Sequence, residues 1–168
     1  MIRSKGFTLT ELLIVLALAV ILATLAAPNF RDFVRSTRMT SEANSLVLGL
    51  NLARSESVKR GRRVNLSSAS GDEFWTTGWA MYEDTDADGT QDGGEPSIRV
   101  GEGMDPPLTL EETVSSASFI SYQSSGVLSV SPLTRTFDLC ESDRNGETGR
   151  QITISVTGRV SIADFVCP

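Results

Sequence analysis

The 168-residue sequence contains no histidine. This absence excludes Ser-His-Asp triads, zinc sites with histidine ligands, and a simple pH switch near neutrality. A Ser-x-x-Lys pattern is missing as well, so the many serines lack the partner that a nucleophile needs. The sequence therefore does not predict an enzyme.

Cysteine is scarce, because Cys140 and Cys167 are the only two. They lie far apart and not in a C-x-x-C motif, so a metal site or a thioredoxin-like motif is not expected. One disulfide is expected if the domain lies in an oxidising compartment. The net charge of −6 argues against nucleic acid as the partner of the whole surface, although a local basic patch can still exist.

One long apolar run fills the N-terminal part of the chain. From Phe7 to Ala27 the only charged residue is Glu11. About 20 such residues in a helix span a hydrocarbon core of roughly 30 Å. Arg3 and Lys5 precede the run, which predicts a cytoplasmic N-terminus and an exported remainder. A cleaved secretory signal peptide is the alternative. Glu11 favours a retained segment, because a carboxylate in lipid costs about 2.5–3.5 kcal/mol and needs a partner.

The stretch "GFTLTELL" resembles the processing site of class III signal sequences, those of type IV pilins and type II secretion pseudopilins. The resemblance implies a leader of residues 1–6, cleavage between Gly6 and Phe7 by a prepilin peptidase, and N-methylation of Phe7. Glu11 is then the family's signature carboxylate, while Thr10 stands where an aliphatic residue is more common. In a filament we expect the new Phe7 amine to meet Glu11 of a neighbouring subunit, because packed helices exclude water.

Pro28 closes the apolar segment, residues 7–28, and would break a helix on local grounds alone. Pilin-like chains have a proline here within a continuing helix, so the resemblance favours a kink. Residues 29–63 are predicted to form an amphipathic helix that ends near Arg60, because Gly61 suits a C-terminal stop. Apolar residues at three- and four-residue steps predict one buried stripe: Phe30, Phe33, Val34, Ala43, Leu46, Val47, Leu50, Ala53 and Val58.

Residues 64–168 are predicted to form a β-rich domain. Short β-type runs alternate with turn residues, which indicates antiparallel sheet packed on the helix. The runs are "RVNLSS", "GWAMYE", "SIRVG", "ASFISYQ", "VLSVS", "TFDLC", "QITISV" and "RVSIADFV". Residues 101–118 are expected to be an irregular loop, because Pro106 and Pro107 cannot join a central strand. The predicted fold class is α+β, a long helix on an antiparallel sheet or sandwich.

Three stretches behind the pilin-like start, "NLARSESVKRG", "WTTGWAMYEDTDADG" and "TGRVSI", resemble minor pilins of the GspH/FimT type. The resemblance covers nearly the whole chain and implies the type IV pilin-like fold. Paired cysteines are more similar to the pilus minor pilins FimU and FimT than to the pseudopilin GspH. A disulfide between Cys140 and Cys167 would tie the C-terminal tail to the sheet and contribute very roughly 3 kcal/mol.

The acidic segment "DTDADGTQDGGE", residues 84–95, has the spacing of an EF-hand calcium loop. Calcium is the one cofactor that the sequence suggests. The candidate ligands are Asp84, Asp86, Asp88, the carbonyl of Thr90, Asp92 and Glu95. Gln91 stands where an aliphatic residue is usual, and the flanks indicate strands instead of helices. An acidic hairpin loop without metal is therefore the alternative.

A basic run near the predicted helix end can contact phosphates; it comprises Arg54, Lys59, Arg60, Arg62 and Arg63. Some FimT proteins bind DNA for uptake through a C-terminal G-R-x-R element, and the resemblance points to Gly158 and Arg159. Ser161 replaces the second arginine, so the match is partial. The alternative is a set of cations that complement a helix end.

The two tryptophans lie close together in the sequence. Trp79 is expected in the core, whereas Trp75 fits either the core or a subunit interface.

Together these features predict a minor pilin that is built into a type IV pilus or primes its assembly, with roles in pilus biogenesis and twitching motility. It would be a single-pass inner-membrane protein with a periplasmic C-terminal domain before it reaches the pilus. Implied partners are other minor pilins, the major pilin, the prepilin peptidase and the inner-membrane assembly platform. The alternatives are a minor pseudopilin of a type II secretion system and a DNA-binding minor pilin for natural transformation.

Overall fold

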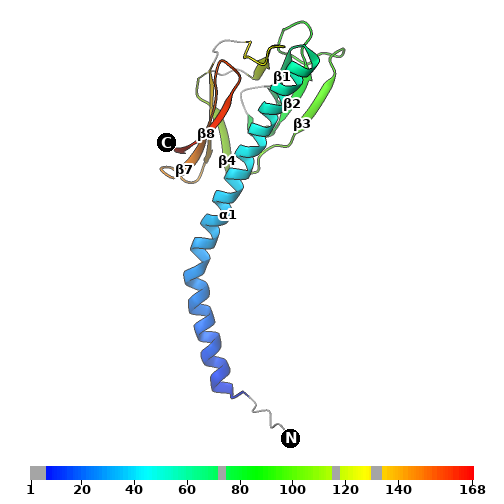
Figure 1. Ribbon diagram of the computed structural model, residues 1–168. Coiled ribbons are helices and arrows are strands. Elements are labelled where there is room, and N and C mark those ends of the chain that lie inside the picture. Colours follow the sequence, from blue (N-terminus) through cyan, green and yellow to red (C-terminus); the bar gives the residue numbers. More distant parts are fainter. Residues whose placement is uncertain (1–6, 72–74, 115–117, 130–133) are drawn as a thin grey trace. The chain divides into compact units, whose positions relative to one another are not determined.

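The computed structural model describes residues 7–71, 75–114, 118–129 and 134–168 (Figure 1). The chain divides into two compact units, residues 1–38 and 39–168, and each is described by itself. Gly6, one of the two predicted cleavage-site residues, lies outside the described residues.

Helix α1, Leu9–Arg60, runs through both units and continues across Pro28. It ends where the sequence predicts, because Gly61 has a φ of 64° and follows the basic last turn. The Gly61 amide donates to the Val58 carbonyl and the Arg62 amide donates to the Ser57 carbonyl. These two bonds form a Schellman motif, which satisfies carbonyls that the end of the helix leaves open.

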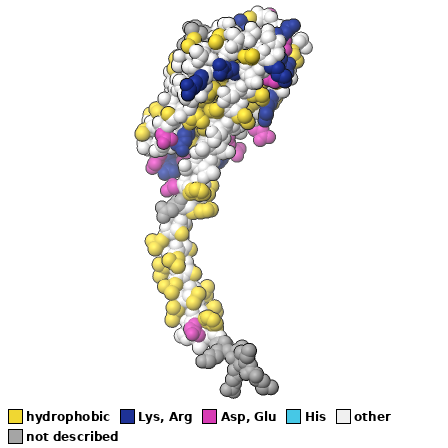
Figure 2. Space-filling model, in the orientation of Figure 1, with side chains coloured by type: hydrophobic (Ala, Val, Ile, Leu, Met, Phe, Trp, Pro, Cys, Tyr) yellow, Lys and Arg dark blue, Asp and Glu magenta, His cyan; other side chains and the backbone are white. Residues whose placement is uncertain are grey.

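The first unit presents its apolar side chains to the outside. Residues 9–27 are all exposed, and Figure 2 shows apolar atoms along the visible face of this stretch. Among the described residues, one helix, α1, is long and apolar enough to cross a membrane by length and composition. The first part of the predicted buried stripe is wrong, because Phe30, Phe33 and Val34 are exposed in the structure. Val58 at the other end is exposed as well.

The second unit contains two four-stranded antiparallel sheets. The first has the order β3-β2-β1-β5, with β1 Val64–Ser68, β2 Trp79–Glu83, β3 Ser97–Gly101 and β5 Phe119–Tyr122. The second has the order β4-β6-β7-β8, with β4 Leu108–Glu112, β6 Arg135–Glu141, β7 Thr148–Ile154 and β8 Val160–Val166. A short 3-10 helix, η1 Trp75–Thr77, precedes β2. The predicted α+β class is therefore confirmed.

The core of the second unit lies where α1 meets both sheets. The buried stripe of α1 begins at Met39 and continues through Ala43, Leu46, Leu50 and Ala53. These steps of three and four residues keep one face of the helix on the sheets. The sheets contribute Val64, Leu66, Met81, Leu108, Leu110, Ile120, Tyr122, Phe137, Leu139, Ile152 and Ile154.

Both tryptophans are buried. Trp75 is 1% exposed and packs edge-on against Phe137 with ring centroids 5.2 Å apart, which resolves its position in favour of the core. Trp79 is core, as predicted. It lies so close to Gly49 of α1 that a Cβ there would come within 2.7 Å of the indole ring, so only glycine leaves room for it.

Two strand predictions are wrong. Strand β4 lies inside the stretch expected to be an irregular loop. The prolines before it do not block it, because β4 starts only at Leu108 and is an edge strand. Conversely, residues 127–129 form no strand and make a single bridge between Tyr122 and Leu128. The last two residues of that predicted strand lie outside the described ones.

Candidate assembly sites and ligand-binding loops

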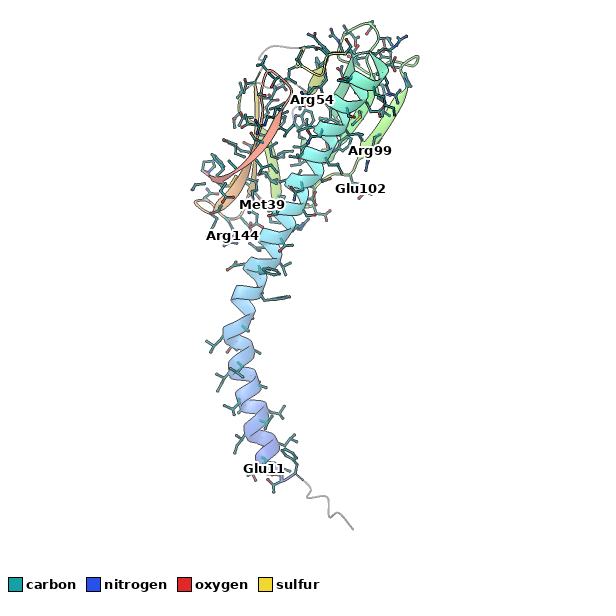
Figure 3. All side chains as sticks on the ribbon, in the orientation of Figure 1. Glu11, Met39, Arg54, Arg99, Glu102 and Arg144 are labelled. Carbon is teal, nitrogen blue, oxygen red and sulfur yellow. A yellow bond between two sulfur atoms is a disulfide. The ribbon has the colours of Figure 1, made fainter. Side chains whose placement is uncertain are left out.

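The N-terminal end of α1 carries the predicted assembly carboxylate, Glu11 (labelled in Figure 3). Its Oε2 atom accepts hydrogen bonds from the Thr8 amide at 2.9 Å and from the Thr8 hydroxyl at 2.8 Å. In return the Glu11 amide donates to the Thr8 hydroxyl oxygen at 3.2 Å. This reciprocal arrangement is a capping box, which satisfies amides that a helix start leaves open. Phe7 precedes it and is 80% exposed.

The capping box gives the Glu11 carboxylate a local role at the start of the helix. Backbone donors without a partner are costly in lipid, so the Thr8–Glu11 bonds stabilise this turn before any neighbour arrives. Within the described residues, Glu11 Oε1 receives no hydrogen bond. Sequence reasoning missed Thr8, although the T-x-x-E spacing ahead of an apolar run signals such a box.

The acidic loop joins β2 to β3, so its flanks are strands, as predicted. The structure brings three of its carboxylates together: one oxygen each of Asp84, Asp86 and Asp88 lie within 4.8 Å of one another. Asp84 is 3% exposed, whereas the other two are exposed. Three converging carboxylate oxygens form a partial oxygen cage of the kind that hard cations prefer.

Neighbouring residues fix the base of this loop. Asn65 of β1 donates from its amide nitrogen to Asp84 Oδ2 at 2.6 Å, and the Ala87 amide donates to Oδ1 at 2.6 Å. The hydroxyl of Tyr82 donates to the Gly89 carbonyl at 2.6 Å. Gly89, at position six of the loop, has a φ of 85°, which suits the sharp turn that a calcium loop needs there.

The last predicted ligands do not join the three clustered carboxylates. Glu95 accepts hydrogen bonds from the Thr85 amide at 2.6 Å and the Asp92 amide at 3.2 Å. Burial raises the pKa of Glu95, but these bonds outweigh it, so the net pKa lies below its ordinary value. The negative charge of Asp88 raises the pKa of Asp92. Thr90 contributes its amide, which donates to Asp88 Oδ1 at 2.7 Å.

The basic run at the end of α1 is partly neutralised. Glu56 pairs with two cations: its Oε2 lies 2.7 Å from Arg60 Nε and its Oε1 lies 3.3 Å from Lys59 Nζ. Arg62 Nε lies 3.2 Å from Glu83 Oε1. The hydrogen bonds from Arg60 and then Lys59 lower the pKa of Glu56. Ion pairs on the helix surface therefore account for much of this charge.

Arg54 of α1 and the turn at Gly158 come together although they are far apart in the sequence. Arg54 Nε donates to the Gly126 carbonyl at 2.9 Å. A Cβ on Gly158 would come within 3.1 Å of the same Arg54 nitrogen, so the Gly158 turn lies directly beside it. Arg159 follows in that turn and is exposed. The G-R element thus lies next to the cationic helix.

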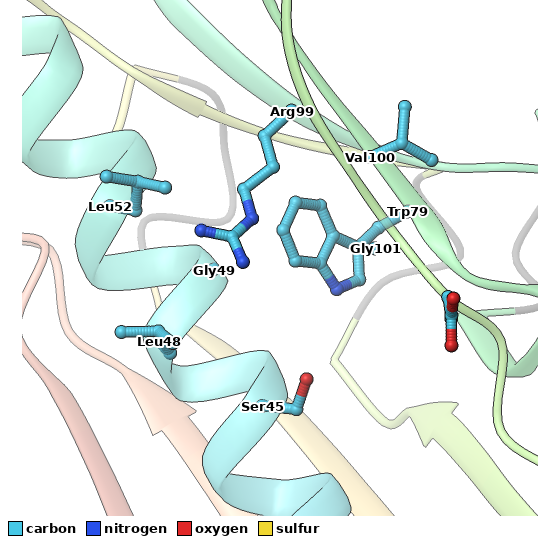
Figure 4. Close-up of a pocket in the computed structure, with 9 residues that line it drawn as sticks. Ser45, Leu48, Gly49, Leu52, Trp79, Arg99, Val100 and Gly101 are labelled. Atoms are coloured by element: carbon cyan, nitrogen blue, oxygen red, sulfur yellow. The ribbon is translucent and has the colours of Figure 1, made fainter.

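A groove of about 290 Å³ separates α1 from the edge strand β3 (Figure 4). Leu48 and Leu52 line it from the helix, and Arg99 and Val100 line it from β3. The Arg99 side chain extends toward the helix beside the ring of Trp79. Leu48 and Val100 are 60% and 65% exposed. No local pattern predicts this groove, because its two walls come from segments that are far apart in the sequence.

Two buried linkages hold the second sheet. Cys140 of β6 and Cys167 after β8 form the expected disulfide, with Cα atoms 5.9 Å apart. Arg135 of β6 forms an ion pair with Glu112 of β4. No local pattern in the sequence predicts this pair, because its two members are 23 residues apart.

Solved structures with a similar architecture define the class. The type IV minor pilin FimU of Pseudomonas aeruginosa matches with a TM-score of 0.65 and 27% identity, over 78% of this chain and 92% of that chain. The minor pseudopilin EpsH of the type 2 secretion system of Vibrio cholerae shares the fold, with a TM-score of 0.56 and 14% identity, over 75% of this chain and 96% of that chain. The architecture is therefore that of type IV minor pilins and pseudopilins.

Family comparisons narrow this class. Residues 42–158 match the family "Type II transport protein GspH", and residues 1–27 match the "Prokaryotic N-terminal methylation motif". The chain belongs to the GspH family and is a FimU-like minor pilin. A fimbrial protein of Pseudomonas aeruginosa is 33% identical over 114 residues, 68% of this chain and 70% of that protein. The type IV major fimbrial protein FimA of Dichelobacter nodosus is 34% identical over 88 residues, 52% of this chain and 54% of that protein.

Proposed function

We propose that the chain begins as a single-pass inner-membrane precursor with its second unit in the periplasm, and is then built into a type IV pilus. The FimU-like fold behind a methylation motif is the observation that carries this proposal. Its partners would be other minor pilins, the major pilin, the prepilin peptidase and the inner-membrane assembly platform. The function is structural and needs no chemistry from the second unit, which is called the head from here on.

The assembly step uses the N-terminal turn. Cleavage between Gly6 and Phe7 exposes an amine on Phe7, one residue before the capping box. Oε2 of Glu11 is held by Thr8, which leaves Oε1 available for the amine of a neighbouring subunit. Loss of the amine or of the carboxylate would leave one charge unpaired in a water-poor environment, where such charges are costly.

A mass-spectrometric measurement tests the processing. We expect the membrane-extracted chain to begin at N-methylated Phe7. A chain that begins near Asn29 would have lost the apolar segment and would overturn the proposal. A gene deletion scored for surface pili, protein secretion and DNA uptake then assigns the role, because loss of pili with intact secretion separates a pilin from a pseudopilin. The higher identity to FimU than to EpsH, 27% against 14%, supports the pilus.

We also propose that the acidic loop binds calcium. The convergence of Asp84, Asp86 and Asp88 supports it, and the positive φ of Gly89 fits such a loop. Three carboxylates would supply the charge, and carbonyls and water would complete the six to eight oxygens that calcium takes. Calorimetric titration tests this, and no heat at millimolar calcium would reject it. The Asp86→Asn variant should weaken the binding.

DNA is a second candidate ligand, favoured by the Gly158 turn, which lies beside Arg54 and is followed by the exposed Arg159. Two cations on neighbouring elements can contact adjacent phosphates, with strong dependence on salt. Filter binding at 50 mM salt, compared with Arg159→Ala, tests the idea. Lack of retention at low salt would reject it.

A further inference from the structure

The stretch between the apolar run and the second unit carries three arginines, Arg31, Arg35 and Arg38. Residues 30–38 are called the collar here. The arginines are spaced by four and three residues, so they start from one face of α1. Arg31 is exposed and the other two are half-buried. Asp32 is the single acidic residue in the collar, so the collar is cationic in a chain whose acidic residues outnumber its basic ones, 21 to 15.

Apolar side chains lie on the adjoining face of the collar. Phe30 and Phe33 are 67% and 66% exposed, and Val34 is 47% exposed. None of them belongs to the core of the second unit. Aromatic rings next to arginines are typical of the boundary between hydrocarbon and water, where a side chain can bury its apolar part and keep its polar end hydrated.

The position of the three arginines runs against the usual charge distribution around a membrane span. Cytoplasmic flanks normally carry the excess of lysine and arginine. Here Arg3 and Lys5 precede the span, whereas three arginines follow it on the exported side. On that side the collar lies at the depth of the headgroup layer, where lipid phosphates are the anions that the membrane offers.

We propose that the collar binds the phosphates of anionic phospholipids at the exported face of the membrane. This inference rests on the proposed membrane span and orientation. The guanidinium group pairs with a phosphate through two parallel hydrogen bonds, which the phosphodiester of a glycerophospholipid offers. The exposed phenylalanines would lie at the level of the acyl boundary.

Helix geometry sets the order in which the arginines reach the lipid. With a rise of 1.5 Å per residue, Arg31 lies about 6 Å beyond Ala27 and Arg38 about 16 Å beyond it. A headgroup layer is about 5–8 Å thick on each side. Helical side chains slant toward the N-terminus, which here is toward the membrane, so Arg31 and Arg35 reach the phosphates and Arg38 reaches them least.

Lipid selectivity in vesicles tests the proposal. The full mature chain is reconstituted in phosphatidylcholine vesicles that carry spin-labelled phosphatidylglycerol or spin-labelled phosphatidylcholine. We expect a preference for phosphatidylglycerol of about fivefold or more at low salt, which falls in 0.5 M salt. Arg31→Gln with Arg35→Gln and Arg38→Gln should remove it. Among single variants, Arg31→Gln should have the largest effect and Arg38→Gln the smallest.

A matched variant controls for net charge. Lys59→Gln with Arg62→Gln and Arg159→Gln removes three exposed cations from the second unit and should keep the preference. A triple arginine-to-lysine variant of the collar keeps the charge, serves if the glutamine variant misfolds, and should retain a reduced preference. Far-UV circular dichroism verifies that α1 stays helical.

Three results would overturn the proposal. They are a wild-type chain without lipid preference, a glutamine variant that keeps it, and a head variant that loses it while the collar variant does not. If the wild type has no lipid preference and the glutamine variant of the collar does not enter pili, the arginines contact an acidic protein surface instead. The vesicle measurement needs no pilus, so it stands even if the proposed pilus role fails.

Discussion

Arg135 and Glu112 form an ion pair in which both side chains are almost inaccessible, at 2% and 1% exposure. The two residues come from adjacent strands β6 and β4 of the second sheet, and two guanidinium nitrogens meet the two carboxylate oxygens. A pair this deep holds an edge strand to its sheet. It also makes the head vulnerable to loss of either partner, because the remaining charge cannot reach water.

Glu112→Gln should therefore destabilise the head by about 3–5 kcal/mol, since Arg135 would stay buried without its counter-charge. Denaturant unfolding of the detergent-solubilised chain measures this loss. The double variant Glu112→Leu with Arg135→Met should recover most of it, because an apolar pair of similar volume avoids the desolvation cost. If the double variant is as unstable as the single one, the charge of Arg135 is not the cause.

Thr8→Val should weaken pilus incorporation without affecting cleavage. The change keeps the side-chain volume but removes the hydroxyl that accepts from the Glu11 amide and donates to its carboxylate. A lost cap costs about 1 kcal/mol, which corresponds to about a fivefold drop in the ratio of sheared pili to membrane-bound subunits. Thr8→Ser is the control and should retain incorporation. Equal incorporation of the valine and serine variants would mean that Glu11 acts without its local partner.

Local patterns in the sequence predicted the ends and faces of elements, but not the contacts between distant segments. Lys59, Arg60 and Gly61 were enough to place the end of α1, because helix stops depend on neighbouring residues. Strand β4 was not predicted, although Leu108 and Leu110 alternate with polar residues, because prolines exclude a central strand but not an edge strand that starts after them.

The candidate sites were likewise predictable where they depend on local spacing and not where they depend on contacts between distant segments. The carboxylate spacing of the acidic loop was visible, and three of its carboxylates do converge. The spacing did not predict that the Thr85 amide donates to the Glu95 carboxylate. A ligand pattern does not show which backbone amides compete for the carboxylate oxygens. The meeting of Arg54 with Gly158 depends on tertiary packing, and no local pattern predicts it.

Removal of the disulfide should lower stability without changing the fold. The bond between Cys140 and Cys167 closes a loop with a sequence separation of 27. Loop closure of this size contributes about 3 kcal/mol, so Cys140→Ser with Cys167→Ser should lower Tm by roughly 10 °C. Reduction of the wild-type chain should produce the same shift. A reduced wild type that melts well above the double variant would assign part of the loss to the serines.

Asp92→Asn should stabilise the calcium-free chain at neutral pH. The charge of Asp88 and then those of Asp86 and Glu95 contribute to a raised pKa of Asp92, so the folded state binds this proton more tightly than the unfolded chain. Stability linked to this group therefore increases as pH falls through the raised folded pKa toward the ordinary value of 3.8. The benefit of the asparagine should be present at pH 7 and should disappear as the pH falls below 3.8, where Asp92 is protonated in both states.

Thermal melts in a calcium chelator at several pH values measure this benefit, with Glu102→Gln as a control that removes one exposed charge outside the loop. Calcium should abolish the advantage of the variant, because the cation offsets the same repulsion among the carboxylates. The loop would not be a calcium site if millimolar calcium left both melting temperatures unchanged. An asparagine variant as stable as the wild type at every pH would mean that solvent already screens the charge of Asp92.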